Sequence, residues 1–241
     1  LLALTRCRLA DVRPISGNAA NTAIALGYLR GGDPIMVNST PAGGHISHNT
    51  IGVFGRRIQT RGLSLSLNAP KHIPLHYFPL AEDLYHLDVQ KSLDLIDQVA
   101  PRLLVLGKSL LLFPEPVQAL AAVCRERGIP ILYDAAHVFG LIVGGQFQDP
   151  WREGATWVTA STHKTFPGPQ RGVIVADLDE ENERKYWPSA DRGVFPGSSS
   201  NHHLHTLPAL LVAIREMRQH AAAYAAQVVH NAQSLGQALD D

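Results

Sequence analysis

Residues 103–135 read LLVLGKSLLLFPEPVQALAAVCRERGIPILYDA, and this stretch decides the fold class. Two short apolar runs, 103–107 and 129–135, are bounded by Gly, Pro or Asp, as expected of strands covered on both faces. Between them, residues 116–127 have a helical pattern that ends at Gly128, a natural C-terminal stop. A strand, a helix and a second strand in this order predict a crossover unit with parallel strands.

The same alternation continues on both sides of this unit. Further strands are predicted at 34–39, 156–162 and 172–177, and further helices at 18–29 and 88–99. The pattern predicts one α/β domain with three layers, α/β/α, around a mostly parallel sheet. In such sheets ligands collect outside the carboxyl ends of the strands, so the polar residues that follow those ends are candidate site residues.

The C-terminal region has a different character, because residues 207–241 have a helical pattern throughout. A helix of this length spans roughly 50 Å, which exceeds the usual globular helix. We therefore expect residues 1–206 to form the α/β domain and residues 207–241 to leave its layers.

Composition excludes several functional classes. The 21 Lys and Arg residues balance 21 Asp and Glu residues, so charge alone would not hold the chain to nucleic acid or to an anionic membrane. The longest apolar stretch, 103–113, is broken by Lys108 and is too short to span a bilayer. Cys7 and Cys124 have no disulfide or metal spacing, which favours a cytoplasmic location.

Lys164 follows the strand predicted at 156–162, within Ser161-Thr162-His163-Lys164-Thr165. Partial burial there would lower the pKa of its amine and make it a nucleophile toward a carbonyl. For a lone lysine, a solvated surface position would be the favoured interpretation. No glycine-rich run precedes it, so a nucleotide phosphate loop is not indicated.

Asp134 lies at the end of the strand predicted at 129–135, and His137 follows two residues after that strand. A half-buried carboxylate needs a cationic partner, and a protonated pyridine nitrogen would serve. A carboxylate that caps the following segment is about as good an interpretation. His137 either faces the same crevice or satisfies a local hydrogen bond.

Ser16, Gly17 and Asn18 stand at the start of the first predicted helix. Free backbone N–H groups and short polar side chains at a helix N-terminus suit a phosphate, although plain capping explains the same residues. Among the 12 histidines, His45 and His48 have HxxH spacing without the Glu of a zinc protease, so no metal site is predicted.

Taken together, these signals resemble one family. The stretches VRPISGNAAN, GGHISH, YDAAHVFGLI, STHKTFPGPQRGVI and VFPGSSSNHHLH resemble, in order and spacing, blocks of serine hydroxymethyltransferase, a pyridoxal-phosphate enzyme of fold type I. The forms PAGGHISH, GGQFQDPWREGA and SNHHLH are most similar to its archaeal-type branch.

The resemblance implies a role for each candidate residue. Lys164 would form the internal aldimine with pyridoxal 5'-phosphate, Asp134 would pair with the pyridinium nitrogen, and His137 would lie near the ring oxygen and the substrate. The phosphate-binding and site-lining residues implied are Ser16, Gly17, Asn18, His163, Ser109 and Thr162. Residues 197–201, with Ser200 and Asn201, would reach the phosphate of a neighbouring subunit, which implies a homodimer with shared sites.

The implied activity is transfer of the hydroxymethyl group of serine to tetrahydrofolate or a related tetrahydropterin, leaving glycine. Three residues depart from the family pattern. Ala42 stands in an AHGGH-like motif, where most members stack a histidine on the ring, so the ring would lack that stacking partner unless another group supplies it. Gln170 is tolerated in the archaeal-type branch, whereas Arg171 replaces a glycine.

The family's N-terminal segment with a catalytic glutamate, and its C-terminal small domain with a carboxylate-binding arginine, have no counterpart in these residues. We therefore expect residues 207–241 to lead toward an absent small domain, and the isolated chain to transfer little or no hydroxymethyl group. The alternatives are a pyridoxal-phosphate aldolase or transaldolase acting on β-hydroxy amino acids, and a non-catalytic fragment that binds the cofactor or dimerises.

Overall fold

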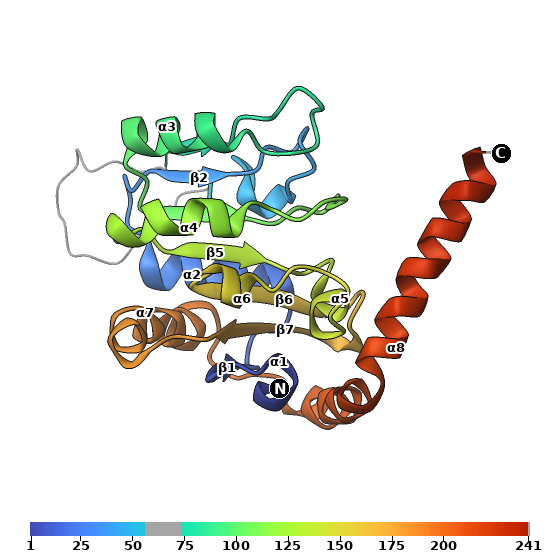
Figure 1. Cartoon of the computed structure of the whole chain (residues 1–241). Coiled ribbons are helices and arrows are strands. Elements are labelled where there is room, and N and C mark those ends of the chain that lie inside the picture. The colour runs from blue at the N-terminus through green and yellow to red at the C-terminus, as the bar shows by residue number, and fades with distance from the viewer. Residues whose placement is uncertain (56–73, 241) are drawn as a thin grey trace.

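The computed structural model describes residues 1–55 and 74–240, and its centre is a twisted β-sheet (Figure 1). Within the described residues the sheet has seven strands in the order β1-β7-β6-β5-β4-β2-β3. The strands are β1 (Leu9–Asp11), β2 (Ile35–Val37), β3 (Leu75–Tyr77), β4 (Leu103–Leu106), β5 (Ile131–Asp134), β6 (Trp157–His163) and β7 (Pro167–Ala176). Strands β3, β2, β4, β5 and β6 run parallel, whereas β7 and β1 are antiparallel to their neighbours.

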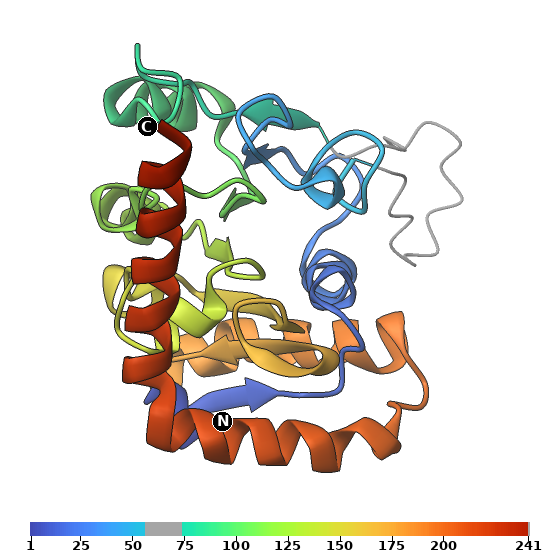
Figure 2. The ribbon, with the colours of Figure 1, turned by 90° about the vertical axis from the view of Figure 1, so that its right-hand side faces the viewer.

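Helices cover both faces of the sheet (Figures 1 and 2). The helices are α1 (Leu2–Thr5), α2 (Gly17–Tyr28), α3 (Val89–Val99), α4 (Val117–Glu126), α5 (Phe139–Val143), α6 (Pro150–Glu153), α7 (Glu180–Arg192) and α8 (Leu207–Asp240), with short turns η1 (Ile46–His48), η2 (Gly193–Ser198) and η3 (Leu204–Thr206). Along β4, Leu104 and Leu106 pack into the core beneath α3 and α4, and Leu103 and Val105 pack into the core beneath α2. This alternation builds two cores, and the predicted three-layer α/β/α class with a mostly parallel sheet is confirmed.

All five predicted strands and all four predicted helices are present, with ends shifted by a few residues. The main difference lies at β6 and β7, which form a hairpin in which His163 pairs with Pro167. Two apolar runs predicted as separate buried strands are therefore antiparallel neighbours, and Lys164 lies in the turn between them. The pattern analysis did not find β1, β3, α1, α5, α6 or α7.

Helix α8 packs on the α/β domain with its first part and leaves the body of the molecule with its second part (Figure 1). Its buried residues all lie in its first part, between Leu210 and Ala225. Beyond them the helix projects away from the sheet layers, and Leu239 is 79% exposed (Figures 1 and 2). Among the described residues no helix combines the length and the apolar character needed to cross a membrane.

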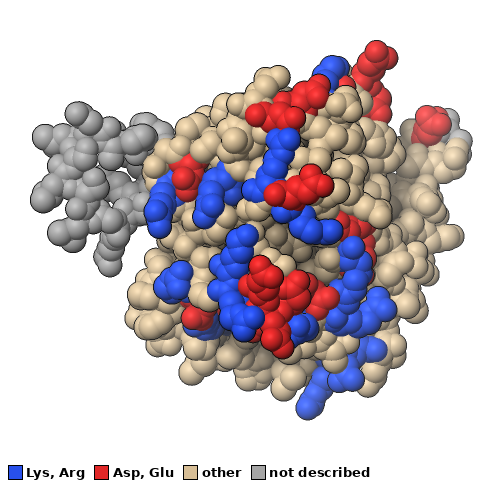
Figure 3. Space-filling model, turned by 60° about the vertical axis from the view of Figure 1, so that its left-hand side comes forward, with Lys and Arg blue, Asp and Glu red and all other residues tan. Residues whose placement is uncertain are grey.

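Charged side chains of both signs are interleaved on the surface. On the face in Figure 3, Lys and Arg side chains surround groups of Asp and Glu side chains, and no broad region of one sign stands out. This distribution agrees with the equal totals of 21 basic and 21 acidic residues. The described residues on this face therefore form no basic stripe of the kind that binds a nucleic-acid backbone (Figure 3).

Candidate active site

The carboxyl ends of four parallel strands meet at one edge of the sheet. The register of β2, β4, β5 and β6 brings the residues at or after their ends to this edge: Asn38, Gly107, Asp134 and His163. Gly107 adopts a φ of 96°, and a Cβ there would lie 2.2 Å from the carbonyl oxygen of Asp134, so only glycine fits. The predicted site residues therefore gather where a parallel sheet binds its ligands.

Asp134 is the centre of a buried polar network. Its Oδ2 accepts hydrogen bonds from Asn21 Nδ2 at 2.7 Å and from His48 Nε2 at 2.9 Å, and its Oδ1 accepts one from the Ala136 N–H at 3.0 Å. The hydroxyl of Thr159 donates to Asn21 Oδ1 at 2.6 Å and fixes which way that amide points. This carboxylate is thus held in place by residues from four elements: strands β5 and β6, helix α2 and turn η1.

The environment of Asp134 keeps it ionised. Burial alone would raise the pKa of its carboxyl, but the hydrogen bonds from His48, Asn21 and the Ala136 N–H, together with the nearby His48, bring the pKa down to about 2. A carboxylate offers about four acceptor positions, and the three bonds of Asp134 leave one free. A permanently charged acceptor with one vacant position suits a cationic N–H donor.

Lys164 faces His137 at the same edge. Its Nζ lies 3.1 Å from His137 Nε2; Lys164 is exposed and His137 is partly buried. The protein around the Lys164 amine lowers its pKa by desolvation, against the opposing effect of Asp134, which is the direction that the sequence predicted. Desolvation and the charge of Lys164 also lower the pKa of His137. The lowered pKa makes the free amine of Lys164, the form that attacks a carbonyl carbon, easier to reach, and the neighbouring His137 imidazole can exchange protons with it.

The start of α2 forms a tight cradle. Ser16 caps the helix, since its Oγ accepts from the Ala19 N–H at 3.1 Å, as the capping interpretation predicted. Gly17 is buried against β6, and a Cβ at this position would lie 2.5 Å from Ser161 Oγ. Asn18 is exposed in the first turn. The free N–H groups of this turn, with no side chain at Gly17, leave room for an anion at the helix N-terminus.

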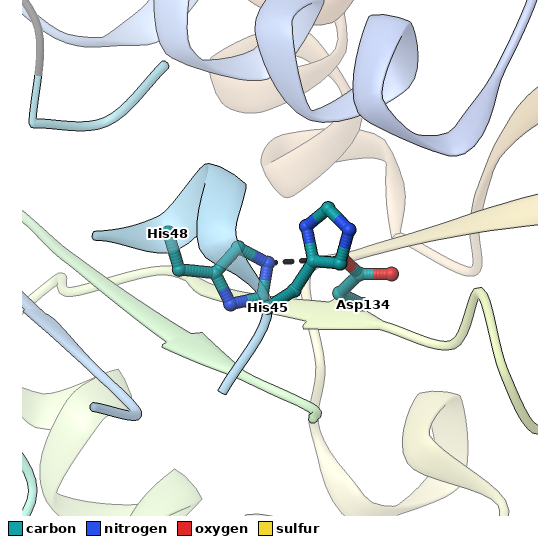
Figure 4. A group of neighbouring side chains, drawn as sticks. All are labelled: His45, His48 and Asp134. Atoms are coloured by element: carbon teal, nitrogen blue, oxygen red, sulfur yellow. Dashed lines mark hydrogen bonds and ion pairs between the residues drawn. The ribbon is translucent and has the colours of Figure 1, made fainter. Parts of the chain in front are cut away.

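The turn that contains His45 and His48 closes over Asp134 (Figure 4). One potential ligand atom from each of His45, His48 and Asp134 lies within 4.8 Å of the other two, a metal-type grouping that HxxH spacing alone did not predict. These atoms already have partners, because His48 Nε2 bonds to Asp134 and His45 Nδ1 accepts from the Ser47 N–H at 3.1 Å. The grouping is thus held together without an ion.

The His45 side chain places an aromatic ring next to Asp134 (Figure 4). The side chain is half-buried, its ring stands edge-on to His48 with centroids 5.9 Å apart, and desolvation lowers its pKa. Figure 4 shows this imidazole beside the Asp134 carboxylate. The stacking group that Ala42 cannot provide is therefore available from His45, three residues further along.

The remaining predicted residues differ in how directly they face the crevice. The Ser109 N–H donates to Gly43 O at 2.8 Å, which joins the segment after β4 to the His45 turn. Thr162 is buried, and its hydroxyl donates to Pro169 O at 2.6 Å rather than toward the crevice. His163 is exposed at the end of β6, and Ser200 and Asn201 are exposed in the segment between η2 and η3.

Sequence reasoning missed three residues of the buried network: Asn21, His48 and Thr159. Asn21 carried a signal, because asparagine is a poor helix former and sits here on the buried side of an otherwise apolar helix. His48 was considered only as half of a metal motif.

Comparison with known proteins gives the site its context. Residues 3–241 match the family model for serine hydroxymethyltransferase. The chain belongs to the serine hydroxymethyltransferase family. It is 45% identical over 234 residues to the serine hydroxymethyltransferase of Pyrococcus abyssi and 42% identical over 231 residues to that of Methanocella arvoryzae. These alignments cover 95% and 96% of the chain, but it spans only 50% of each relative.

A solved structure is similar as well. An L-threonine transaldolase from Pseudomonas fluorescens, in its internal aldimine state, superposes with a TM-score of 0.82 at 28% identity. The match covers 98% of this chain and 49% of that one. The serine hydroxymethyltransferase family and this fold neighbour share the pyridoxal-phosphate fold type I architecture that the sequence predicted.

The residues present fit pyridoxal phosphate. A Cβ on Gly17 would lie 2.5 Å from Ser161 Oγ, so the tip of α2 packs tightly on β6, and the N–H groups of its first turn offer donors for a phosphate. Asp134 keeps one acceptor position for a pyridinium N–H, and Lys164 provides an amine of lowered pKa for an aldehyde. The donor set therefore matches the phosphate, the ring nitrogen and the carbonyl carbon of one ligand.

Proposed function

We propose that this chain binds pyridoxal phosphate and carries the cofactor-binding part of a serine hydroxymethyltransferase, which interconverts serine and glycine with a tetrahydropterin. The observation that carries the proposal is Lys164 Nζ at 3.1 Å from His137 Nε2, at the same strand edge as the buried Asp134. Membership of the family supports the same conclusion. The activity of the whole protein is part of the proposal, because the chain spans about half the length of its relatives.

The start of α2 would bind the phosphate. The backbone N–H groups of Gly17 and Asn18 and the polar side chains of Ser16 and Asn18 would contact its oxygens, with His163 approaching from the end of β6. The helix dipole adds a favourable interaction with the negative charge.

Asp134 would hold the ring nitrogen in its protonated form, since a carboxylate with a pKa of about 2 stays charged at neutral pH. His45 would lie against the ring face, in place of the partner absent at Ala42. When bound, pyridoxal phosphate withdraws electrons from the α-carbon of an amino acid, so that the bond to its β-carbon can break.

Lys164 would hold the aldehyde carbon of the cofactor and give it up to an incoming amino acid. His137, beside Lys164, would accept or return protons and contact the ring oxygen, which Ser109 would also approach. Thr162 would act indirectly: its hydroxyl donates to Pro169 O and so fixes the backbone of the β6–β7 hairpin.

We also propose a homodimer with shared sites, in which residues 197–201 with Ser200 and Asn201 reach the neighbour's phosphate. The exposure of this segment supports the proposal. Residues 1–206 would form the large domain, and α8 would connect it to a small domain. The free, buried thiols of Cys7 and Cys124 support a cytoplasmic location.

The test is a titration of the chain with pyridoxal phosphate, followed by absorbance in the visible. We expect a saturable band, then a spectral change on adding glycine with tetrahydrofolate. If L-threonine is cleaved to an aldehyde while serine turnover does not depend on the tetrahydropterin, a transaldolase or aldolase is indicated, which the structural neighbour makes the second candidate. The absence of any band would refute cofactor binding.

Gly17→Ala should weaken cofactor binding. The new methyl would lie 2.5 Å from Ser161 Oγ, and overpacking of this kind costs about 1–3 kcal/mol; carried into the bound state by the displaced helix tip, this raises the dissociation constant for pyridoxal phosphate roughly 5- to 150-fold. Adding Ser161→Ala removes the clashing oxygen and should restore much of the affinity, whereas Ser161→Ala alone should change it little. Equal affinity of Gly17→Ala and wild type would contradict the cradle.

A further inference from the structure

Arg171 is a fully buried cation with unusual partners. Its side chain is 0% exposed, and within the described parts of the chain no carboxylate forms an ion pair with it. Burying an unpaired guanidinium is costly, so its donors must be satisfied by other groups. Main-chain carbonyl oxygens and one hydroxyl do this, from two segments far away in sequence.

The first segment leads into the cradle. Arg171 donates to Val12 O from Nε at 3.1 Å and from Nη2 at 2.8 Å, and Nη2 also reaches Arg13 O at 3.4 Å. The next residue continues the attachment, because the Gly172 N–H donates to Pro14 O at 2.9 Å and a Cβ on Gly172 would lie 2.0 Å from Ser16 O. The start of α2 is therefore placed by direct contact with this part of β7.

The second segment follows Ser200 and Asn201. The other guanidinium nitrogen, Nη1, donates to His203 O at 2.6 Å and to the hydroxyl of Thr206 in η3. Arginine presents its donors in a rigid planar fork, so one side chain fixes both segments relative to each other. Lysine, with a single ammonium on a flexible chain, cannot hold both at once.

We propose that Arg171 is a positioning residue for phosphate binding, which sets the cradle at Ser16–Asn18 and the segment after Asn201 in one fixed arrangement. This inference rests on the proposed function, since the ligand whose phosphate it serves is pyridoxal phosphate. Arg171 itself touches neither segment's phosphate-binding groups: it acts through the backbone that carries them.

The test compares two ligands that differ only in the phosphate. Dissociation constants for pyridoxal phosphate and for unphosphorylated pyridoxal are measured by the visible band in wild type, Arg171→Met and Arg171→Lys. We expect Arg171→Met to raise the dissociation constant for pyridoxal phosphate about tenfold and that for pyridoxal less than about twofold. The effect of Arg171→Lys should lie in between. The matched control is Arg152→Met, because Arg152 also ties a distant carbonyl, Arg6 O, but near the opposite end of the sheet; it should leave the ratio of the two constants unchanged.

General destabilisation of the fold would weaken the binding of both ligands alike. An unchanged ratio of the two dissociation constants in Arg171→Met therefore overturns the inference. If Arg171→Met does not fold, Arg171→Lys and Thr206→Val, which removes one acceptor of the fork, decide by the same ratio. Failure of wild type to bind pyridoxal phosphate would instead count against the proposed function. The two failures are therefore distinguishable.

Discussion

Lys164→Ala is expected to abolish the visible band of bound pyridoxal phosphate. This amine lies in the β6–β7 turn, with a pKa lowered by desolvation and His137 Nε2 at 3.1 Å, and we propose that it holds the aldehyde. Removing an activated nucleophile takes away the covalent bond, whereas the phosphate cradle remains. The band should fall below detection, and any hydroxymethyl transfer should drop by about 1,000-fold or more, roughly 4 kcal/mol in the barrier.

Two variants make this result specific. Lys164→Arg keeps the positive charge but cannot form the bond, so it should also lack the band. Lys91→Ala, on the exposed surface of α3, serves as the control and should bind like wild type. Retention of the full band in Lys164→Ala would show that another amine holds the cofactor.

Asp134→Asn is expected to have the second large effect. Asparagine keeps the shape of the side chain but not its charge, so it cannot hold a ring nitrogen in the protonated form. In the whole enzyme of which we propose this chain is the cofactor-binding part, activity should fall about 100-fold, or roughly 2.7 kcal/mol in the barrier. The visible band should survive, because Lys164 is intact, and this separates the variant from Lys164→Ala. Wild-type activity in Asp134→Asn would overturn the assigned role.

The same variant has a pH signature in stability. The pKa of Asp134 is lowered from 3.8 to about 2 in the folded protein, so its ionised form stabilises the fold. This contribution, about 2 kcal/mol, is complete well above pH 4 and disappears as the pH falls through 2. The free energy of unfolding of Asp134→Asn should therefore be lower than that of wild type at pH 7 and converge with it near pH 2. Asp177→Asn, at the opposite end of the sheet, is the control.

Local pattern predicted most of the sheet because its strands are short, apolar and bounded by turn residues. It failed where the local signal was absent or misleading. Helix α7 is strongly polar and contains Pro188, although Asp179 caps it by accepting from the Asn182 N–H. Strand β1 has three residues and depends on pairing with β7, which is distant in sequence.

The site divides in the same way. Asp134, His137 and Lys164 follow predicted strand ends, so topology alone pointed to them. Asn21 and His48 bond to Asp134 across 113 and 86 residues of sequence, and no local pattern contains that information. The phosphate-binding residues were proposed from the likeness of whole motif blocks to one family. The local sequence alone was explained equally well by helix capping.

Helix α2 has a consequence that concerns the length of the ligand. Gly17 at its tip faces the proposed phosphate, and Asn21, one turn further along, bonds to the carboxylate proposed for the ring nitrogen. Four residues of helix measure about 6 Å along the axis. Helix α2 therefore fixes the distance between the proposed phosphate site and the proposed ring-nitrogen site. We expect a ligand with a longer or shorter link between its phosphate and its ring to bind at only one of these two sites.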